Sequence, residues 1–220
     1  MSVLVIAPHP DDEVLGCGGT IAKNVENGEE VFVVVVTKGC EPLFHQDSVE
    51  KVREECKAAD ALLGVRKTIF LDFPAAMLED VPRYKLNDAL VDVIQGIKPS
   101  TVFIPHRGDM QLDHKMITDA SMVALRPKYN HTVSKIYQYE TLSETGWDVP
   151  NVTNAFIPTA YSDITGFLNL KLDAMKQFST QIASYPNPRS VEAIKALAMY
   201  RGSNVGLSAA EAFELVREIV

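Results

Sequence analysis

The sequence predicts an α/β protein, a Rossmann-like three-layer sandwich in which helices cover both faces of a mostly parallel sheet. Two observations support this fold class. Four short apolar runs are typical of strands buried on both faces, and they lie at residues 3–6, 31–36, 68–71 and 101–104. Segments with helical periodicity separate these runs, and strands that alternate with helices form parallel sheets. We therefore expect the strand order 3-2-1-4-5, with extra helices at the C-terminal end.

Local signals support each element in turn. The first run stops at a Pro-His-Pro break, and the second is an unbroken series of β-branched and aromatic residues, typical of an interior strand. Helices are expected at residues 12–25, 47–63, 84–97 and from about His114 onward. Asp47 or Ser48 suits the start of the second helix, and Gly64 suits its end. An alternating pattern predicts a fifth strand at residues 134–139.

Beyond residue 163 the pattern is helical throughout. The expected helices cover residues 164–178, 191–200 and 208–219, and we place them against one end of the sheet. The chain has 220 residues, of which 46% are hydrophobic, enough for one sizeable core. No linker or internal repeat divides it, so we expect a single domain over residues 1–220.

Composition restricts the partners and the compartment. A net charge of −8 gives little support for binding to a nucleic-acid backbone. The three cysteines, Cys17, Cys40 and Cys56, lack CxxC spacing, which disfavours a disulfide framework and an all-thiolate zinc site. No apolar run approaches the ~20 residues of a membrane span, and the first residues lack the features of a signal peptide. We expect a cytoplasmic protein with no integral membrane segment; a homo-oligomer is compatible with these features.

A possible metal-binding pair follows the first strand. His9 and Asp12 stand three residues apart, so a single backbone turn brings an imidazole and a carboxylate toward one ion. Pro8 and Pro10 restrict the backbone on both sides of His9. Ligands of open α/β sheets bind beyond the carboxyl ends of the strands, which is where this loop is expected. Alone, such a pair more often caps a helix than binds a metal.

A second polar cluster, residues 105–114, follows the fourth strand. Strands one and four are neighbours in the expected order, so the two loops face each other across one crevice. His9, Asp12 and His114 then supply three ligands and leave a fourth position for water, which is the composition of a catalytic zinc site. The alternative for His114 is a helix-start or core histidine.

The string PHPDDE at residues 8–13, followed by glycines and later by Asp113 and His114, resembles the PIG-L/LmbE family of zinc-dependent N-deacetylases. The resemblance covers nearly the whole chain. It implies that His9, Asp12 and His114 bind zinc and that Asp11 is the general base. It also implies a small amino-sugar substrate of the N-acetylglucosamine type. The ligand set does not select strongly for zinc, so another divalent metal such as Fe²⁺ is an alternative.

Four further residues have expected roles at this site. Asp113, adjacent to a ligand, is a second catalytic candidate that orients an imidazole, with a helix N-cap as the alternative. Arg53 matches the family's Arg-x-Glu and offers a fork of donors to a substrate hydroxyl, carboxylate or phosphate. Asp109 either contacts the substrate or braces its loop. Gln111 is the fourth, as a donor to the substrate.

Gln111 also departs from the family pattern. Many members have a histidine three residues before the last zinc ligand, where it polarises the intermediate or protonates the leaving amine. Glutamine donates a hydrogen bond to an oxyanion but is no general acid at neutral pH. Either Asp11 transfers the proton alone, which we favour, or His106 acts as the acid, or activity is reduced.

Two other functions are compatible with parts of the sequence. The glycine-rich run from Gly16 to Thr20 resembles the loop of S-adenosylmethionine or nucleotide-binding proteins, but nine residues separate it from its strand. We interpret these glycines as sites of close packing between helix and sheet. The second alternative is a non-catalytic carbohydrate-binding protein that has kept the fold but lost catalytic activity because Gln111 stands in place of the histidine.

Overall fold

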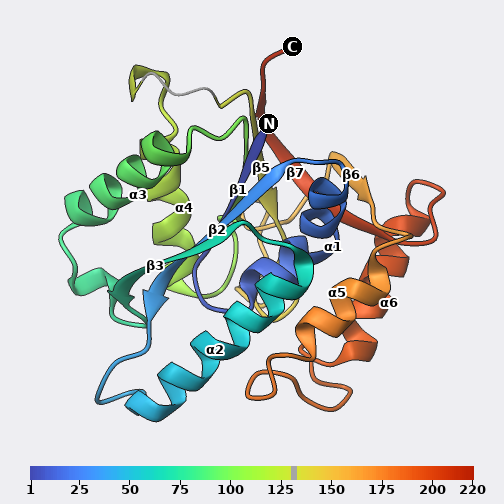
Figure 1. Ribbon diagram of the computed structural model, residues 1–220, viewed down its shortest axis with the longest axis horizontal. Helices are drawn as coiled ribbons and strands as arrows, with labels where there is room; N and C mark the ends of the chain where they lie inside the picture. The colour runs from blue at the N-terminus through green and yellow to red at the C-terminus, as the bar shows by residue number, and fades with distance from the viewer. Residues whose placement is uncertain (130–132) are drawn as a thin grey trace.

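The strands form one sheet in the order β3-β2-β1-β4-β5-β7-β6 (Figure 1). The structure is a computed structural model that describes residues 1–129 and 133–220. Its strands are β1 (Ser2–Ala7), β2 (Glu30–Lys38), β3 (Lys67–Pro74), β4 (Thr101–Pro105), β5 (Lys135–Tyr139), β6 (Ala160–Asp163) and β7 (Ala210–Glu218). The first five strands are parallel to one another and follow the order 3-2-1-4-5, which confirms the predicted fold class, and the sheet continues beyond β5 with two strands that were not predicted.

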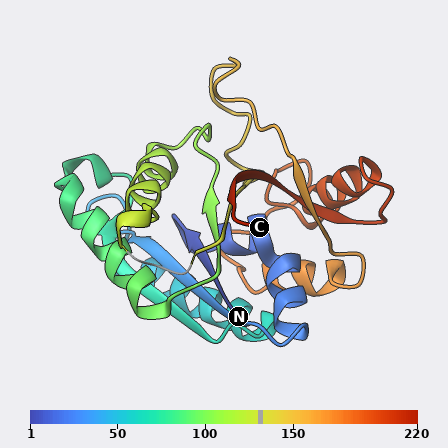
Figure 2. The same cartoon turned by 90° about the horizontal axis from the view of Figure 1, so that it is seen from above.

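Helices cover both faces of this sheet (Figure 2). The α-helices are α1 (Asp12–Glu26), α2 (Gln46–Leu63), α3 (Arg83–Ile97), α4 (Leu112–Ala124), α5 (Leu168–Met175) and α6 (Val191–Ser203). Two short 3-10 helices span Leu78–Asp80 and Pro127–Tyr129. Within the described ranges, no helix is long and apolar enough to cross a bilayer.

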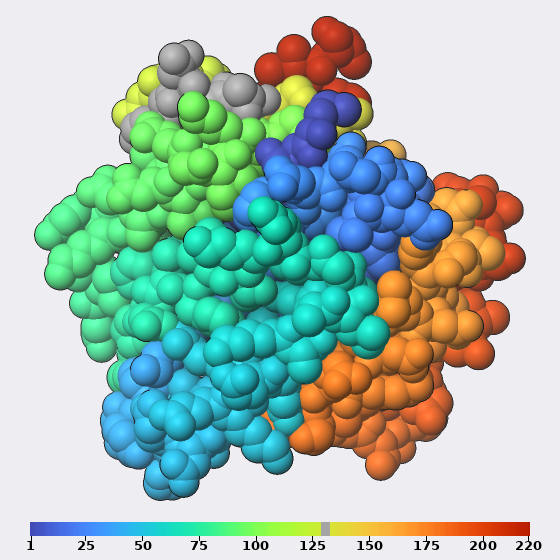
Figure 3. All heavy atoms as spheres, in the orientation of Figure 1, coloured from blue at the N-terminus to red at the C-terminus, as the bar shows by residue number. Residues whose placement is uncertain are grey.

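The alternation of side chains along β1 divides the core into two layers. Val3 and Val5 pack with α1, α2 and α5, whereas Leu4 and Ile6 pack with α3 and α4. Successive strand residues point to opposite faces, so a strand covered on both sides is apolar throughout. On the first face, α2 and α5 lie side by side (Figures 1 and 3).

The C-terminal segment corrects one prediction. The helix expected at residues 208–219 is wrong, because this segment is strand β7, antiparallel to both β5 and β6. β6 itself was not predicted. The outer edge of β5 needs a partner for its backbone groups, and β7 supplies it while Phe213 packs 4.9 Å from the ring of Phe103. Tertiary pairing therefore overrides the local helical pattern. The two other C-terminal helices are present as α5 and α6.

Glycines let α1 approach the sheet closely. A Cβ on Gly16 would lie 2.2 Å from Cδ2 of Tyr139, whose ring is fully buried and whose hydroxyl donates to the carbonyl of Ile6 at 2.9 Å. A Cβ on Gly19 would lie 2.7 Å from Ile164. The glycine-rich run is thus a packing surface of a helix, as the packing interpretation predicted.

A buried ion pair ties α1 to the C-terminal elements. The Lys171 ammonium donates to Glu211 Oε1 at 2.6 Å and to the carbonyl of Leu15 at 2.8 Å. Glu211 also accepts from the backbone N–H groups of Gly19 and Thr20 at 2.9 and 2.7 Å. Each buried charge therefore has hydrogen-bond partners, which is the condition under which an ion pair is tolerated in a core.

Replacement of Gly16 by alanine should lower the free energy of unfolding by about 1–3 kcal/mol, because the Tyr139 ring has no room to move away. Gly96→Ala in α3 is the matched control: nothing lies within 4 Å of its added Cβ, and alanine favours a helix by up to about 1 kcal/mol. Urea unfolding of both variants measures the difference. Equal shifts in the same direction would refute the packing role of Gly16.

Candidate metal centre and cavity

A cavity of about 770 Å³ lies at the carboxyl end of the central strands. Its walls come from the segments that follow β1, β2, β3 and β4, from the N-terminal part of α2, and from Thr180, Gln181 and Arg189. His9, Asp11, Gln111, Asp113 and Arg189 are among the residues that line it. This is the position at which open α/β sheets bind their ligands.

A tight backbone turn at Asp11 connects β1 to α1. Asp11 has φ of 110°, a left-handed conformation that costs about 1–3 kcal/mol in a non-glycine residue. Two hydrogen bonds hold it there: the Asp11 N–H donates to Glu13 Oε2 at 3.1 Å, and the His9 N–H donates to Asp12 Oδ2 at 2.9 Å. The turn thereby directs the side chains of three consecutive acidic residues to different neighbours.

His9, Asp12 and His114 converge as the sequence predicted. Asp12 Oδ2 lies 3.2 Å from His9 Nδ1 and 3.3 Å from His114 Nε2. One ligand atom from each residue lies within 4.8 Å of the others. His114 Nε2 and Asp12 Oδ1 are buried without a hydrogen-bond partner in the structure. Buried polar atoms are normally paired, so these two fit a ligand set for a divalent cation.

Carboxylates fix both imidazoles from behind. His9 Nε2 donates to Asp113 Oδ2 at 3.0 Å, and Asp113 also accepts from the Ala76 N–H at 2.8 Å. His114 Nδ1 donates to Asp109 Oδ2 at 2.8 Å. These bonds select the tautomers that leave His9 Nδ1 and His114 Nε2 free to face Asp12. Asp113 therefore lies where an orienting residue is needed, and Asp109 does the same for His114.

Electrostatics at this group favour a positive charge. Burial lowers the pKa of each imidazole, but the neighbouring carboxylates outweigh it and raise the pKa of His9 to about 9 and of His114 to about 10. The same imidazoles hold the pKa of Asp12 far below its usual range, against the effect of its burial. A divalent cation bound here would take the place of the protons on the two ring nitrogens that face Asp12.

Asp11 has the properties of an acid–base group. It is 1% exposed, and neither carboxylate oxygen has a hydrogen-bond partner. Burial raises the pKa of Asp11 to about 7, while the guanidinium of Arg189, with Nε at 3.6 Å, opposes that shift. A carboxyl with a pKa near neutrality both accepts and donates a proton at physiological pH.

Arg189 is a cavity residue to which sequence reasoning assigned no role. It lies in the segment between α5 and α6, and its Nη1 donates to Gln181 Oε1 at 3.0 Å. Glu55 of α2 anchors this segment by accepting from the hydroxyl of Ser179 at 2.6 Å and from Thr180. The segment is a loop without a periodic pattern, so no local signal in the sequence indicated that Arg189 enters the cavity.

Gln111 lies at the start of α4 and lines the cavity. Its amide nitrogen donates to Glu144 Oε1 at 3.2 Å, a contact that the sequence did not predict. Burial raises the pKa of the Glu144 carboxyl. The amide nitrogen carries a second hydrogen, so Gln111 keeps one donor for a ligand.

His106 is engaged in packing. Nδ1 donates to Glu214 at 2.9 Å, and Nε2 faces the carbonyl of Asn154 at 3.2 Å. Glu214 outweighs burial and raises the pKa of His106, so the doubly protonated ring is favoured. With both nitrogens occupied and no place in the cavity lining, His106 is unsuited to the acid role that was one alternative.

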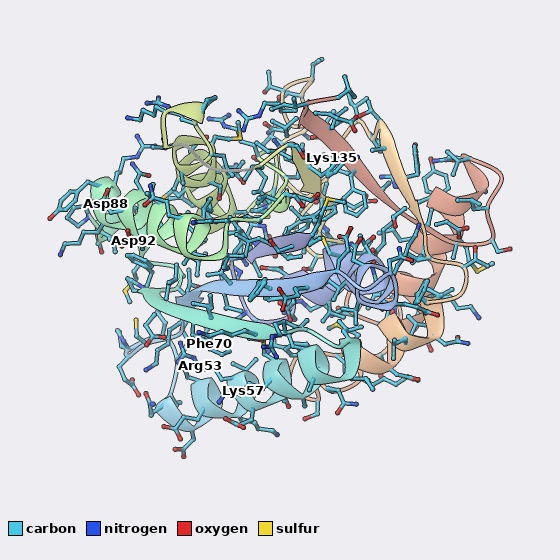
Figure 4. The ribbon with its side chains drawn as sticks, turned by 45° about the horizontal axis from the view of Figure 1, so that its top comes forward. Arg53, Lys57, Phe70, Asp88, Asp92 and Lys135 are labelled. Carbon is cyan, nitrogen blue, oxygen red and sulfur yellow. The ribbon has the colours of Figure 1, made fainter. Side chains whose placement is uncertain are left out.

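Arg53 lies elsewhere than the substrate-binding prediction requires. Its guanidinium pairs with Asp72 and lies 4.6 Å from the centroid of the Phe70 ring. Figure 4 labels Arg53 and Phe70, which lie close to each other. Neither Arg53 nor Asp72 belongs to the cavity lining. The ion pair and the ring therefore already engage the fork of donors that we expected to face the substrate.

The layered α/β sheet, with its candidate metal ligands at the crevice between the central strands, is similar to known proteins. A model of the family described as PIG-L, GlcNAc-PI de-N-acetylase, matches residues 4–125. An uncharacterized deacetylase, YaiS of Escherichia coli K12, is 32% identical over 80% of this chain and 89% of its own. The chain belongs to the PIG-L family.

Other similarities extend over nearly the whole chain. The diacetylchitobiose deacetylase of Thermococcus kodakarensis is 25% identical over 97% of this chain and 82% of its own. The conserved protein TT1542 of Thermus thermophilus superimposes with a TM-score of 0.81 at 26% identity, covering 99% of this chain and 96% of its own. GalB of Pseudomonas putida, a 4-carboxy-2-hydroxymuconate hydratase, has a TM-score of 0.79 at 22% identity, covering 100% and 97% of the two chains. The last similarity shows the fold alone, because one fold hosts several chemistries.

Asp109→Asn should lower the affinity for a divalent metal about 10- to 100-fold, because the amide is a weaker acceptor for His114 Nδ1–H. Competition with a chromophoric chelator measures this affinity. Asp119→Asn is the control, since Asp119 pairs with Arg107 at the surface and should leave affinity unchanged. If Asp109→Asn also binds metal normally, the orienting role of Asp109 is wrong.

Proposed function

We propose that this protein is a metal-dependent hydrolase that removes the N-acetyl group from an N-acetylglucosamine-type sugar or glycoconjugate. The observation that carries the proposal is the convergence of His9, Asp12 and His114 next to the buried, unpartnered carboxylate of Asp11. The names of the deacetylase relatives support the reaction class and the type of sugar. Residues 1–220 would act as one deacetylase domain.

His9 Nδ1, Asp12 and His114 Nε2 would hold the metal. Two imidazole nitrogens and one carboxylate suit Zn²⁺, and they also suit Fe²⁺, which uses the same ligand types. When bound, such an ion lowers the pKa of water to about 7 and polarises a carbonyl oxygen. Asp109 and Asp113 keep both rings in the orientation that this requires.

Asp11 would transfer the protons of the reaction. It lies in the cavity lining beside Asp12, and a carboxylate here accepts a proton from the attacking water. The resulting carboxylic acid then returns that proton to the amine that leaves. Arg189, 3.6 Å from Asp11, favours the ionised carboxylate before attack and limits the rise of its pKa.

Gln111 and Arg189 would orient the substrate. The free hydrogen of the Gln111 amide is available to the carbonyl oxygen as negative charge develops, although glutamine supplies no proton. The remaining wall mixes apolar and polar side chains, including Phe44, Val49 and Lys51. A cavity of about 770 Å³ with such a lining suits a small glycoconjugate.

The metal-loaded protein should release acetate from at least one member of a panel of N-acetylated amino sugars and glycosides. Asp11→Asn should lower kcat by about 10²- to 10⁴-fold, because the amide cannot accept the proton. Acetate release and metal content are measured on the same samples, and the variant should retain its metal. Asp119→Asn again serves as the control.

Two results would contradict the proposal in different ways. Undiminished turnover by Asp11→Asn would remove Asp11 from proton transfer while leaving the reaction intact. Absence of acetate from the whole panel, with metal bound, would favour the non-catalytic carbohydrate-binding alternative.

A further inference from the structure

A second group of metal-ligating side chains lies behind the turn at Asp11, outside the cavity. Glu13 comes from the first turn of α1, while Cys56 and Asp60 stand one turn apart on α2. Cys56 Sγ lies 3.7 Å from Glu13 Oε1 and 3.9 Å from Asp60 Oδ2. All three residues are at most 2% exposed. Two carboxyls and one thiol are therefore enclosed together between two helices.

Among the described residues, no basic side chain forms an ion pair with Glu13 or Asp60. Glu13 and Asp60 are both acidic, and two further acids, Asp11 and Asp12, directly precede Glu13 in the chain. Burial raises the pKa of the Asp60 carboxyl to about 7. The cluster must be neutralised either by protons or by a cation.

A carboxylate oxygen without a hydrogen-bond partner favours a cation over protons. Asp60 Oδ2 accepts from the Thr68 hydroxyl at 2.5 Å, but Asp60 Oδ1 is buried and has no hydrogen-bond partner. One ligand atom from each of the three residues lies within 4.8 Å of the others. Zn–S and Zn–O bonds of about 2.3 and 2.0–2.2 Å in a tetrahedral site place S and O about 3.5 Å apart. The separations in this cluster are a few tenths of an ångström larger.

We propose that Glu13, Cys56 and Asp60 form a second metal site, distinct from the group at His9, that takes a thiophilic divalent cation such as Zn²⁺. The thiolate sets the preference, because sulfur ligands select zinc over magnesium or calcium. Binding displaces the Cys56 thiol proton and any carboxyl proton to solvent. All three side chains are buried, and a bound ion would link α1 to α2. Glu13 Oε2 would still accept from the Asp11 N–H.

Cobalt(II) substitution of the full-length protein tests this site. The group at His9 contains no sulfur, so a cobalt–thiolate charge-transfer band in the near ultraviolet reports only a site that includes a cysteine. The metal-free protein is titrated with Co²⁺ while absorbance and bound metal are followed. We expect two equivalents of metal per chain and a thiolate band that appears with one of them.

Variants then assign the band. Cys56→Ser should abolish it and remove one equivalent, and Asp60→Asn should weaken binding at the same site. Cys17→Ser is the matched control, because Cys17 is another fully buried thiol, and it should keep the band and both equivalents. His114→Ala should remove the other equivalent and leave the band, which separates this proposal from the catalytic one.

One titration of the unmodified protein is enough to overturn the proposal. If it binds metal without any thiolate band, Cys56 remains a protonated thiol that donates to Glu13, and the cluster is neutralised by protons. A band that survives in Cys56→Ser but disappears in Cys17→Ser would likewise refute the assignment to these residues.

Discussion

Three residue pairs, from Val3 opposite Thr101 to Val5 opposite Phe103, hold β1 and β4 parallel and adjacent at the centre of the sheet. Parallel strands end at the same edge, so the loop after β1 and the loop after β4 begin side by side although about a hundred residues separate them in sequence. This pairing is what brings His9 and Asp12 to His114. The helices on both faces then bury β1 and β4 between two apolar layers.

Elements that depend on local interactions could be predicted from the sequence, whereas elements that depend on contacts between distant residues could not. The first five strands, their order and the α-helices before residue 130 were predictable, because apolar runs and connection rules are local or topological. The convergence of the proposed metal ligands followed from that order. Strand β7 was not predictable in this way: its apolar positions also suit a helix, and only the free edge of β5 decides between them. Long-range pairing supplies the information that the local pattern lacks.

Side-chain roles at the site show the same division. The position of Asp113 beside His114 indicated that this carboxylate orients an imidazole. In the structure, however, Asp113 accepts a hydrogen bond from His9, and Asp109 accepts one from His114. Spacing cannot make this choice, because both acids lie within five residues of the ligand. The place of Arg189 depends on a loop with no periodic pattern, and Arg53 is occupied by a partner on the next strand.

Three consecutive acidic residues at the start of α1, Asp11, Asp12 and Glu13, lie in three different environments. An α-helix turns by about 100° per residue, so consecutive side chains diverge. Asp12 faces His114, Glu13 faces Cys56 on α2, and Asp11, in the left-handed turn before the helix, stays in the cavity wall. The strained backbone at Asp11 is held from one side by Glu13 and from the other by the His9–Asp12 contact. The charge state of Glu13, set by protons or by a bound cation, would therefore affect the backbone of Asp11 through one hydrogen bond, although Glu13 does not line the cavity.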